Sequence, residues 1–128
     1  MHPFRKYLFI VILFGFNQAI AHAETDILQI FDQFVTSSAA AGKCEKPDKE
    51  TLNRFLANFQ MVTVLATQKL ETENPDSTKQ TIAMTMKARS DLIAKKVHEL
   101  IEDSGCEYPG TQEVIKRFYA QAAWKPAQ

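Results

Sequence analysis

The two cysteines of this chain, Cys44 and Cys106, are 62 positions apart and constrain its fold more than any other feature. Apolar residues at helical spacing fill two stretches between them, residues 52–70 and 82–100. Each stretch predicts a helix of about 25 residues, so the two helices of an antiparallel hairpin cover nearly equal lengths. Both cysteines then lie at the same end of the hairpin. The spacing therefore predicts a Cys44–Cys106 disulfide.

Other uses of the cysteines fit the sequence poorly. Neither cysteine belongs to a Cys-x-x-Cys pair, the arrangement of a thioredoxin-like redox site. A tetrahedral zinc site takes about four ligands, but after residue 23 the chain contains only two cysteines and one histidine, His98. A structural disulfide is typical of proteins exported into an oxidising compartment.

The first 23 residues have the order of a secretory signal peptide. Two basic residues precede an apolar run over residues 7–16, and small residues two apart end the segment at Ala23. The alternative is an uncleaved membrane anchor, but a membrane-spanning helix needs about 20 apolar residues, and polar residues interrupt this run from Asn17 on. We expect cleavage after Ala23, a single helical domain over residues 24–128, and no stable membrane insertion after cleavage.

The charge of the mature part argues against nucleic acid as a partner. Cleavage removes two basic residues, which leaves 13 Lys and Arg against 15 Asp and Glu. A nucleic-acid-binding protein usually has a basic excess, and this chain has none. We expect a periplasmic or secreted protein whose modest core is built around its remaining phenylalanines, which are Phe31, Phe34, Phe55, Phe59 and Phe118.

Helical periodicity extends over almost the whole mature chain, and no segment alternates as a half-buried strand does. We predict an all-α bundle of about four helices, in which two shorter helices flank a long central antiparallel hairpin. We expect the first helix to extend from Thr25 to Gly42, and the second from an Asp48 cap to the Asn74–Pro75 turn. We expect the third helix to extend from a cap at Asp76 or Ser77 to Gly105, and the fourth to begin after Gly110 and Thr111.

No motif in the chain predicts catalysis. The segment HELIE, from His98 to Glu102, differs from the zinc-protease motif His-Glu-x-x-His because Glu102 replaces the second histidine. At about 100° per residue, His98 and Glu102 also lie opposite the apolar stripe of their helix. The chain has no nucleophile elbow and no glycine-rich phosphate loop. We therefore expect no catalytic residues, no metal site, no cofactor and no enzymatic activity.

Apolar residues outside the core stripes are the strongest functional signal. Val64 and Met84 each point away from the core side of their own helix, at about the same level of the hairpin, and Met61 and Leu65 extend the region. Arg89 falls within an apolar stripe, where it either meets a carboxylate or faces a partner. Contiguous exposed apolar area is typical of interaction sites, although scattered surface hydrophobes are common. These five residues predict a binding surface for another protein or for a second copy.

In size, export and helical architecture, the chain resembles acid-stress periplasmic chaperones and the helical immunity proteins that neutralise secreted toxins. It contains no diagnostic motif of either family, so no functional residues are carried over. We expect a non-enzymatic protein-binding module, such as an inhibitor, an immunity-type protein or an accessory protein of the envelope or of secretion. The alternative is a chaperone-like protein that holds unfolded clients under stress such as low pH. A weaker alternative is an enzyme without a recognisable site.

Overall fold

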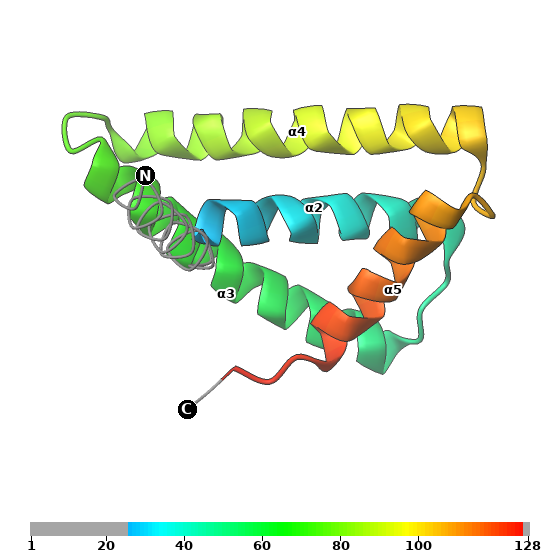
Figure 1. The fold of residues 1–128 in the computed structure, drawn as a ribbon. Helices are drawn as coiled ribbons and strands as arrows, with labels where there is room; N and C mark the ends of the chain where they lie inside the picture. Colours follow the sequence, from blue (N-terminus) through cyan, green and yellow to red (C-terminus); the bar gives the residue numbers. More distant parts are fainter. Residues whose placement is uncertain (1–25, 127–128) are drawn as a thin grey trace, which may run out of the picture.

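The computed structural model describes residues 26–126, and in this range the chain forms four α-helices and no strand (Figure 1). These helices are α2 (Ile27–Cys44), α3 (Lys49–Glu73), α4 (Lys79–Ser104) and α5 (Pro109–Ala123). The predicted all-α bundle of four helices is therefore confirmed. The predicted signal peptide, residues 1–23, lies outside the described residues.

The first described helix, α2, lies between the two arms of the long hairpin (Figure 1). The arms α3 and α4 run antiparallel and diverge from the turn at residues 74–78, while α5 crosses α3 at the open end. α2 packs against all three other helices, and both α3 and α4 contact α2 more extensively than they contact each other. The predicted hairpin is present, but its arms are splayed, and α2 is the central element rather than a flanking one.

A cluster of five phenylalanine rings explains why the arms are splayed. Phe55 of α3 contacts Phe34 of α2 and Phe118 of α5, with ring centroids 5.4 and 4.4 Å apart. Phe31 and Phe59 extend the cluster toward the hairpin turn with an edge-on contact at 5.8 Å. Four of these rings are buried and Phe59 is half-buried, which confirms the predicted aromatic core. The rings fill the space between α2, α3 and α5.

At the open end of the hairpin, a small residue of α2 packs against its neighbours. Ala40 is buried against Ile101 of α4 and Ile115 of α5. Beside them, Cys44 and Cys106 form the predicted disulfide, with an S–S distance of 2.05 Å and a Cα–Cα distance of 5.6 Å. Because α2 and α4 run in the same direction (Figure 1), the bridge joins the C-terminal ends of two parallel helices.

The helix starts follow local capping chemistry. The Asp48 side chain accepts a hydrogen bond of 2.7 Å from the Thr51 amide, which confirms Asp48 as the cap of α3. The cap of α4 is Thr78, whose hydroxyl accepts from the Thr81 amide at 3.1 Å. The predicted cap at Asp76 or Ser77 is therefore wrong by one or two residues, because those residues belong to the turn.

Three further boundaries were predicted at Gly42, at Gly105 and after Gly110 and Thr111. Gly105 has a φ of 86°, which favours glycine, and it ends α4 as expected. Gly42 has no such positive φ, so α2 continues past it to Cys44. α5 begins earlier than expected, at Pro109, because proline is tolerated in the first turn of a helix.

Reduction of the disulfide is expected to destabilise the fold strongly. The bridge closes a loop over a sequence separation of 62 residues, and the chain-entropy model gives about 4 kcal/mol for a loop of this size. For a domain of about 100 residues, such a loss lowers the Tm by about 15–30 °C. Thermal melts followed by circular dichroism, with and without reductant, measure this shift.

The control is the Cys44→Ala, Cys106→Ala double variant, which should melt at the lower temperature whether or not reductant is present. An oxidised protein whose Tm does not respond to complete reduction would contradict the stabilising role of the bridge.

Candidate interaction surfaces

The polar groups of the described core have structural partners. The buried Ser37 hydroxyl donates a hydrogen bond to the Gln121 side-chain oxygen, which joins α2 to α5. Within residues 26–126, no buried side-chain nitrogen or oxygen lacks a hydrogen-bond partner. In the same range, no group of three or more His, Cys, Asp or Glu side chains could hold a metal ion, and His98 is exposed. None of the described helices is both long and apolar enough to cross a membrane.

Three exposed apolar side chains of α4, Met84, Leu92 and Leu100, form a surface that we call the α4 ridge. Their exposed fractions are 64%, 55% and 47%. The three residues are spaced by eight positions, and each step covers about 12 Å along the helix and about 80° around it, so the side chains follow a spiral. The neighbouring Ile82 and Met86 are buried in the core, so Met84 stands on the outward side of α4.

A second apolar surface, which we call the α3 groove, runs along α3 beside α2. It consists of Pro47, Leu52, Leu56, Phe59 and Val64. One hollow of about 190 Å³ lies between α2 and α3 and is lined in part by Gly42, Pro47, Leu52 and Leu56. A second hollow of about 320 Å³ continues from Leu56 through Phe59 to Val64. Leu56 lines both hollows, but only the first is enclosed by a second helix, because all residues that line the second hollow belong to α3.

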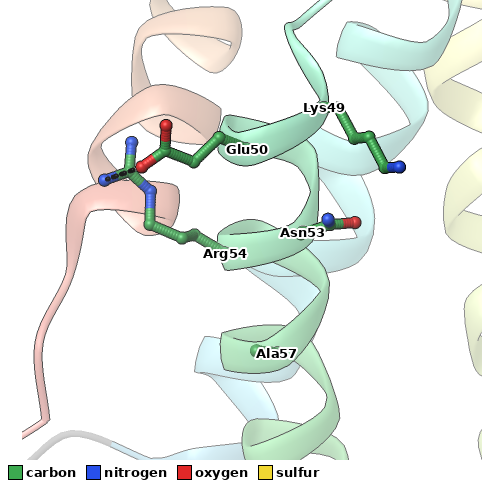
Figure 2. A pocket seen from close by; sticks show the side chains of 5 residues that line it. All are labelled: Lys49, Glu50, Asn53, Arg54 and Ala57. Carbon is green, nitrogen blue, oxygen red and sulfur yellow. Dashed lines mark ion pairs between the residues drawn. The ribbon is translucent and has the colours of Figure 1, made fainter.

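A third hollow lies on the outward side of α3 near its start (Figure 2). Its lining is Lys49, Glu50, Asn53, Arg54 and Ala57. All five residues belong to α3, so no second element encloses a ligand there. Glu50 and Arg54 pair at 3.7 Å, while Lys49 projects from the opposite side of the helix (Figure 2). We interpret this hollow as the open surface of a single helix.

The structure does not bring the predicted binding residues together in one patch. Val64 and Leu65 are exposed on α3 by 49% and 45%, Met84 is exposed on α4, and Met61 is half-buried. α2 separates the two helices, and each turns its core side toward α2 (Figure 1). The outward sides of Val64 and Met84 therefore face in opposite directions.

Met61 and Leu65 lie on the flank of α3 that faces the end of α5. On this flank, the Asn58 side-chain amide donates to the main-chain oxygens of Gln121 and Trp124 at 2.8 and 2.9 Å. At about 100° per residue, Met61 lies opposite Leu52 around the helix. Of the predicted α3 residues, only Val64 therefore belongs to the α3 groove.

Arg89 is held by a carboxylate of α2. Its Nε and Nη2 atoms donate to the two carboxylate oxygens of Asp32 at 2.6 and 2.7 Å. This hydrogen-bonded carboxylate raises the pKa of Arg89 above its ordinary value. The pair joins α2 to α4, so we interpret Arg89 as a structural residue rather than a partner-facing one.

A second ion pair joins the start of α2 to α3. The Lys69 ammonium donates to the Asp26 carboxylate at 2.8 Å, and the same carboxylate accepts from the Leu28 amide as the cap of α2. These two hydrogen bonds, first that of Lys69, lower the pKa of Asp26 below its ordinary value of 3.8. α2 is thus tied to each hairpin arm by one of its own carboxylates.

Several surface residues could not be recognised from the predicted core stripes. Leu52 and Leu100 belong to those stripes, yet the structure leaves them 39% and 47% exposed. Leu56 and Leu92 carried no prediction, although the i, i+4 spacing of Leu56 from Leu52 is a signal that could have found the α3 groove. Comparisons with protein-family models, with curated proteins and with solved structures found no match for this chain.

Replacing Asp32 by Asn is expected to lower the free energy of unfolding by about 1 kcal/mol. The change leaves the Arg89 guanidinium without its counter-charge, but the cost is moderated because the two side chains remain 32% and 39% exposed. Urea denaturation followed by circular dichroism measures the loss. Arg89→Lys keeps the positive charge but loses the bidentate geometry, so its free energy of unfolding should fall by less than that of Asp32→Asn. An unchanged urea midpoint for Asp32→Asn would show that the pair does not hold α2 to α4.

Proposed function

We propose that this protein is an exported, non-enzymatic protein-binding module that acts through the α4 ridge. The observation that carries the proposal is the exposure of three large apolar side chains, Met84, Leu92 and Leu100, along a single helix. Contiguous exposed apolar area on a protein surface usually marks an interaction site. The partner is a protein with an apolar groove that receives a convex helical face.

The way in which α4 is held supports this role. Its middle is tied to α2 by the Arg89–Asp32 pair, and its C-terminal end is tied to α2 through the Cys106 disulfide. A binding surface on a fixed helix loses little conformational entropy when it docks. Met84 adds an unbranched side chain that adapts to the shape of a partner.

The compartment supports the same proposal. The disulfide, and the lack of a membrane-spanning helix among residues 26–126, are compatible with a periplasmic or extracellular protein. The predicted signal peptide adds an export route. An inhibitor, an immunity-type protein or an envelope or secretion accessory protein acts by this kind of surface binding.

Replacing Met84 and Leu92 by Asp should abolish partner binding without unfolding the protein, because both side chains are more than half exposed. The measurement is affinity capture by the oxidised protein from the envelope and secreted fractions of its own host. The matched control replaces Gln80 and His98, which are exposed on the same helix, by Asp.

One dominant partner, lost with the ridge variant and kept with the control, is the expected result. Equal capture by both variants would exclude the α4 ridge as the binding surface. Many weakly bound clients would favour the second candidate, a chaperone-like protein.

A specific observation favours that second candidate. Two carboxylates, Asp26 and Asp32, tie α2 to the two hairpin arms. Acid neutralises carboxylates and makes the net charge of the protein strongly positive, which weakens the compact state. α2 carries much of the buried apolar surface, so its release at low pH would expose surface that binds unfolded clients.

The acid response can be tested through Asp26. Because its pKa lies below 3.8, the stability that this carboxylate contributes is fully present above pH 3.8 and is lost as the pH falls through the lowered pKa. Asp26→Asn removes the charge but keeps a good helix cap. We expect the variant to melt below the wild type at neutral pH, and the two Tm values to converge in acid.

Apolar-dye binding at about pH 3, followed by a return to neutral pH, tests the chaperone reading itself. The chaperone hypothesis is supported if the wild type binds the dye reversibly over the pH range in which its Tm falls. Tm curves for the wild type and Asp26→Asn that stay parallel down to this pH would exclude Asp26 as part of an acid trigger.

A further inference from the structure

The α3 groove has a self-complementary sequence centred on Gln60. Leu56 and Val64 are each four residues from Gln60, and Lys49 and Glu71 are each eleven residues from it. At about 100° per residue, all five side chains fall within roughly 80° of the helix circumference. A two-fold axis at Gln60, perpendicular to α3, would therefore bring together residues of matching chemistry from two copies of the helix.

The charges at the two ends of this surface are opposite and lack ion-pair partners within residues 26–126. Lys49, at the start of α3, projects away from the Glu50–Arg54 pair (Figure 2). Glu71, near the end of α3, pairs with no basic group of the described chain, since the adjacent Lys69 contacts Asp26 and Glu73. Lys49 and Glu71 thus place one positive and one negative charge without an ion-pair partner beyond the two ends of the apolar centre, which is Leu56 and Val64.

We propose that the α3 groove is the dimer interface of this protein and that its occupant is α3 of a second copy, in antiparallel orientation. Leu56 of each copy then packs against Val64 of the other, and Lys49 of each copy faces Glu71 of the other. A shallow crossing of about 20°, as in antiparallel helical bundles, keeps both helices within reach of these contacts over this length.

The charge pattern selects this orientation. In a parallel pair, Lys49 would face Lys49 and Glu71 would face Glu71, and like charges in contact are repulsive. The antiparallel pair contains two Lys49–Glu71 contacts and also opposes the two helix dipoles. It is a closed two-fold arrangement, so both copies use the same surface. The assembly therefore stops at two subunits.

The rest of the fold is compatible with this interface. Phe55, Val62 and Ala66 of α3 are buried on the opposite, core side, so docking does not disturb them. α2 stands between α3 and α4 (Figure 1), which leaves the α4 ridge of each copy uncovered. The dimer therefore goes beyond the proposed function and does not depend on it, because the two use different helices.

The test measures the dimer dissociation constant of the oxidised protein by sedimentation equilibrium at neutral pH. Lys49→Glu and Glu71→Lys should each weaken the dimer roughly tenfold, since each change turns two attractive contacts into repulsive ones. An equimolar mixture of these two variant chains should regain the wild-type constant, because the mixed dimer again pairs opposite charges at both ends. Lys49 is exposed and Glu71 is half-buried, and neither belongs to the buried residues of α3.

The apolar centre is tested with Leu56→Asp, which should give a monomer. Its matched control is Leu65→Asp, a residue of similar exposure on the other flank of α3, which should remain dimeric. A wild-type protein that is monomeric at every concentration would overturn the proposal and leave the groove to a different protein or another segment. The proposal would also be overturned if the Leu56→Asp variant remained a dimer. It would be overturned as well if the mixture of Lys49→Glu and Glu71→Lys chains had a dissociation constant no lower than that of either variant alone.

Discussion

The packing of five phenylalanine rings between α2, α3 and α5 is the interaction on which the rest of the structure depends. Phe55 lies at its centre and is almost completely buried. Because α2 supplies two of the rings, it has to lie inside the hairpin, and the arms have to open to admit it. The outward sides of α3 and α4 consequently face away from each other, and the protein has two separate apolar surfaces instead of one.

The features that follow from local chemistry were predictable from the sequence. The helices appear as apolar residues at helical spacing, Asp48 and Gly105 mark boundaries through capping and a positive φ, and the disulfide follows from the equal lengths of two neighbouring helices. The capping signals lie within a few residues of the helix ends that they specify, and the disulfide follows from the two helices that lie between its cysteines. The boundary errors at Gly42 and Pro109 arise because both residues are also tolerated inside a helix.

The packing of the helices against one another could not be predicted from the sequence. The apolar stripe of α2 is compatible with a flanking position or a central one, and only the fit of Phe31 and Phe34 against α3 decides between them. The same limit applies to Arg89, whose carboxylate partner is on another helix, 57 residues away. Leu52 and Leu100 have the spacing of core residues, yet the packing of the four helices leaves both of them exposed.

The stability of α4 depends unusually on specific ties rather than on buried area. Only Ile82, Met86 and Ile101 of this 26-residue helix are buried, against seven residues of the shorter α2. The pair with Asp32 and the disulfide compensate for this thin apolar contact. A helix that needs little of its circumference for the core can expose the remainder, which is why α4 carries a long uncovered face.

The central position of α2 also affects how the chain can be made. Synthesis proceeds from the N-terminus, so α2 emerges before any of the three helices that bury it. Phe118, which completes the aromatic cluster, lies in the last helix. The fold therefore cannot accumulate helix by helix during synthesis, and the α2 segment remains an exposed apolar peptide until nearly the whole chain has been made. During this interval it is the part of the chain most prone to aggregation and most accessible to the cell's folding factors.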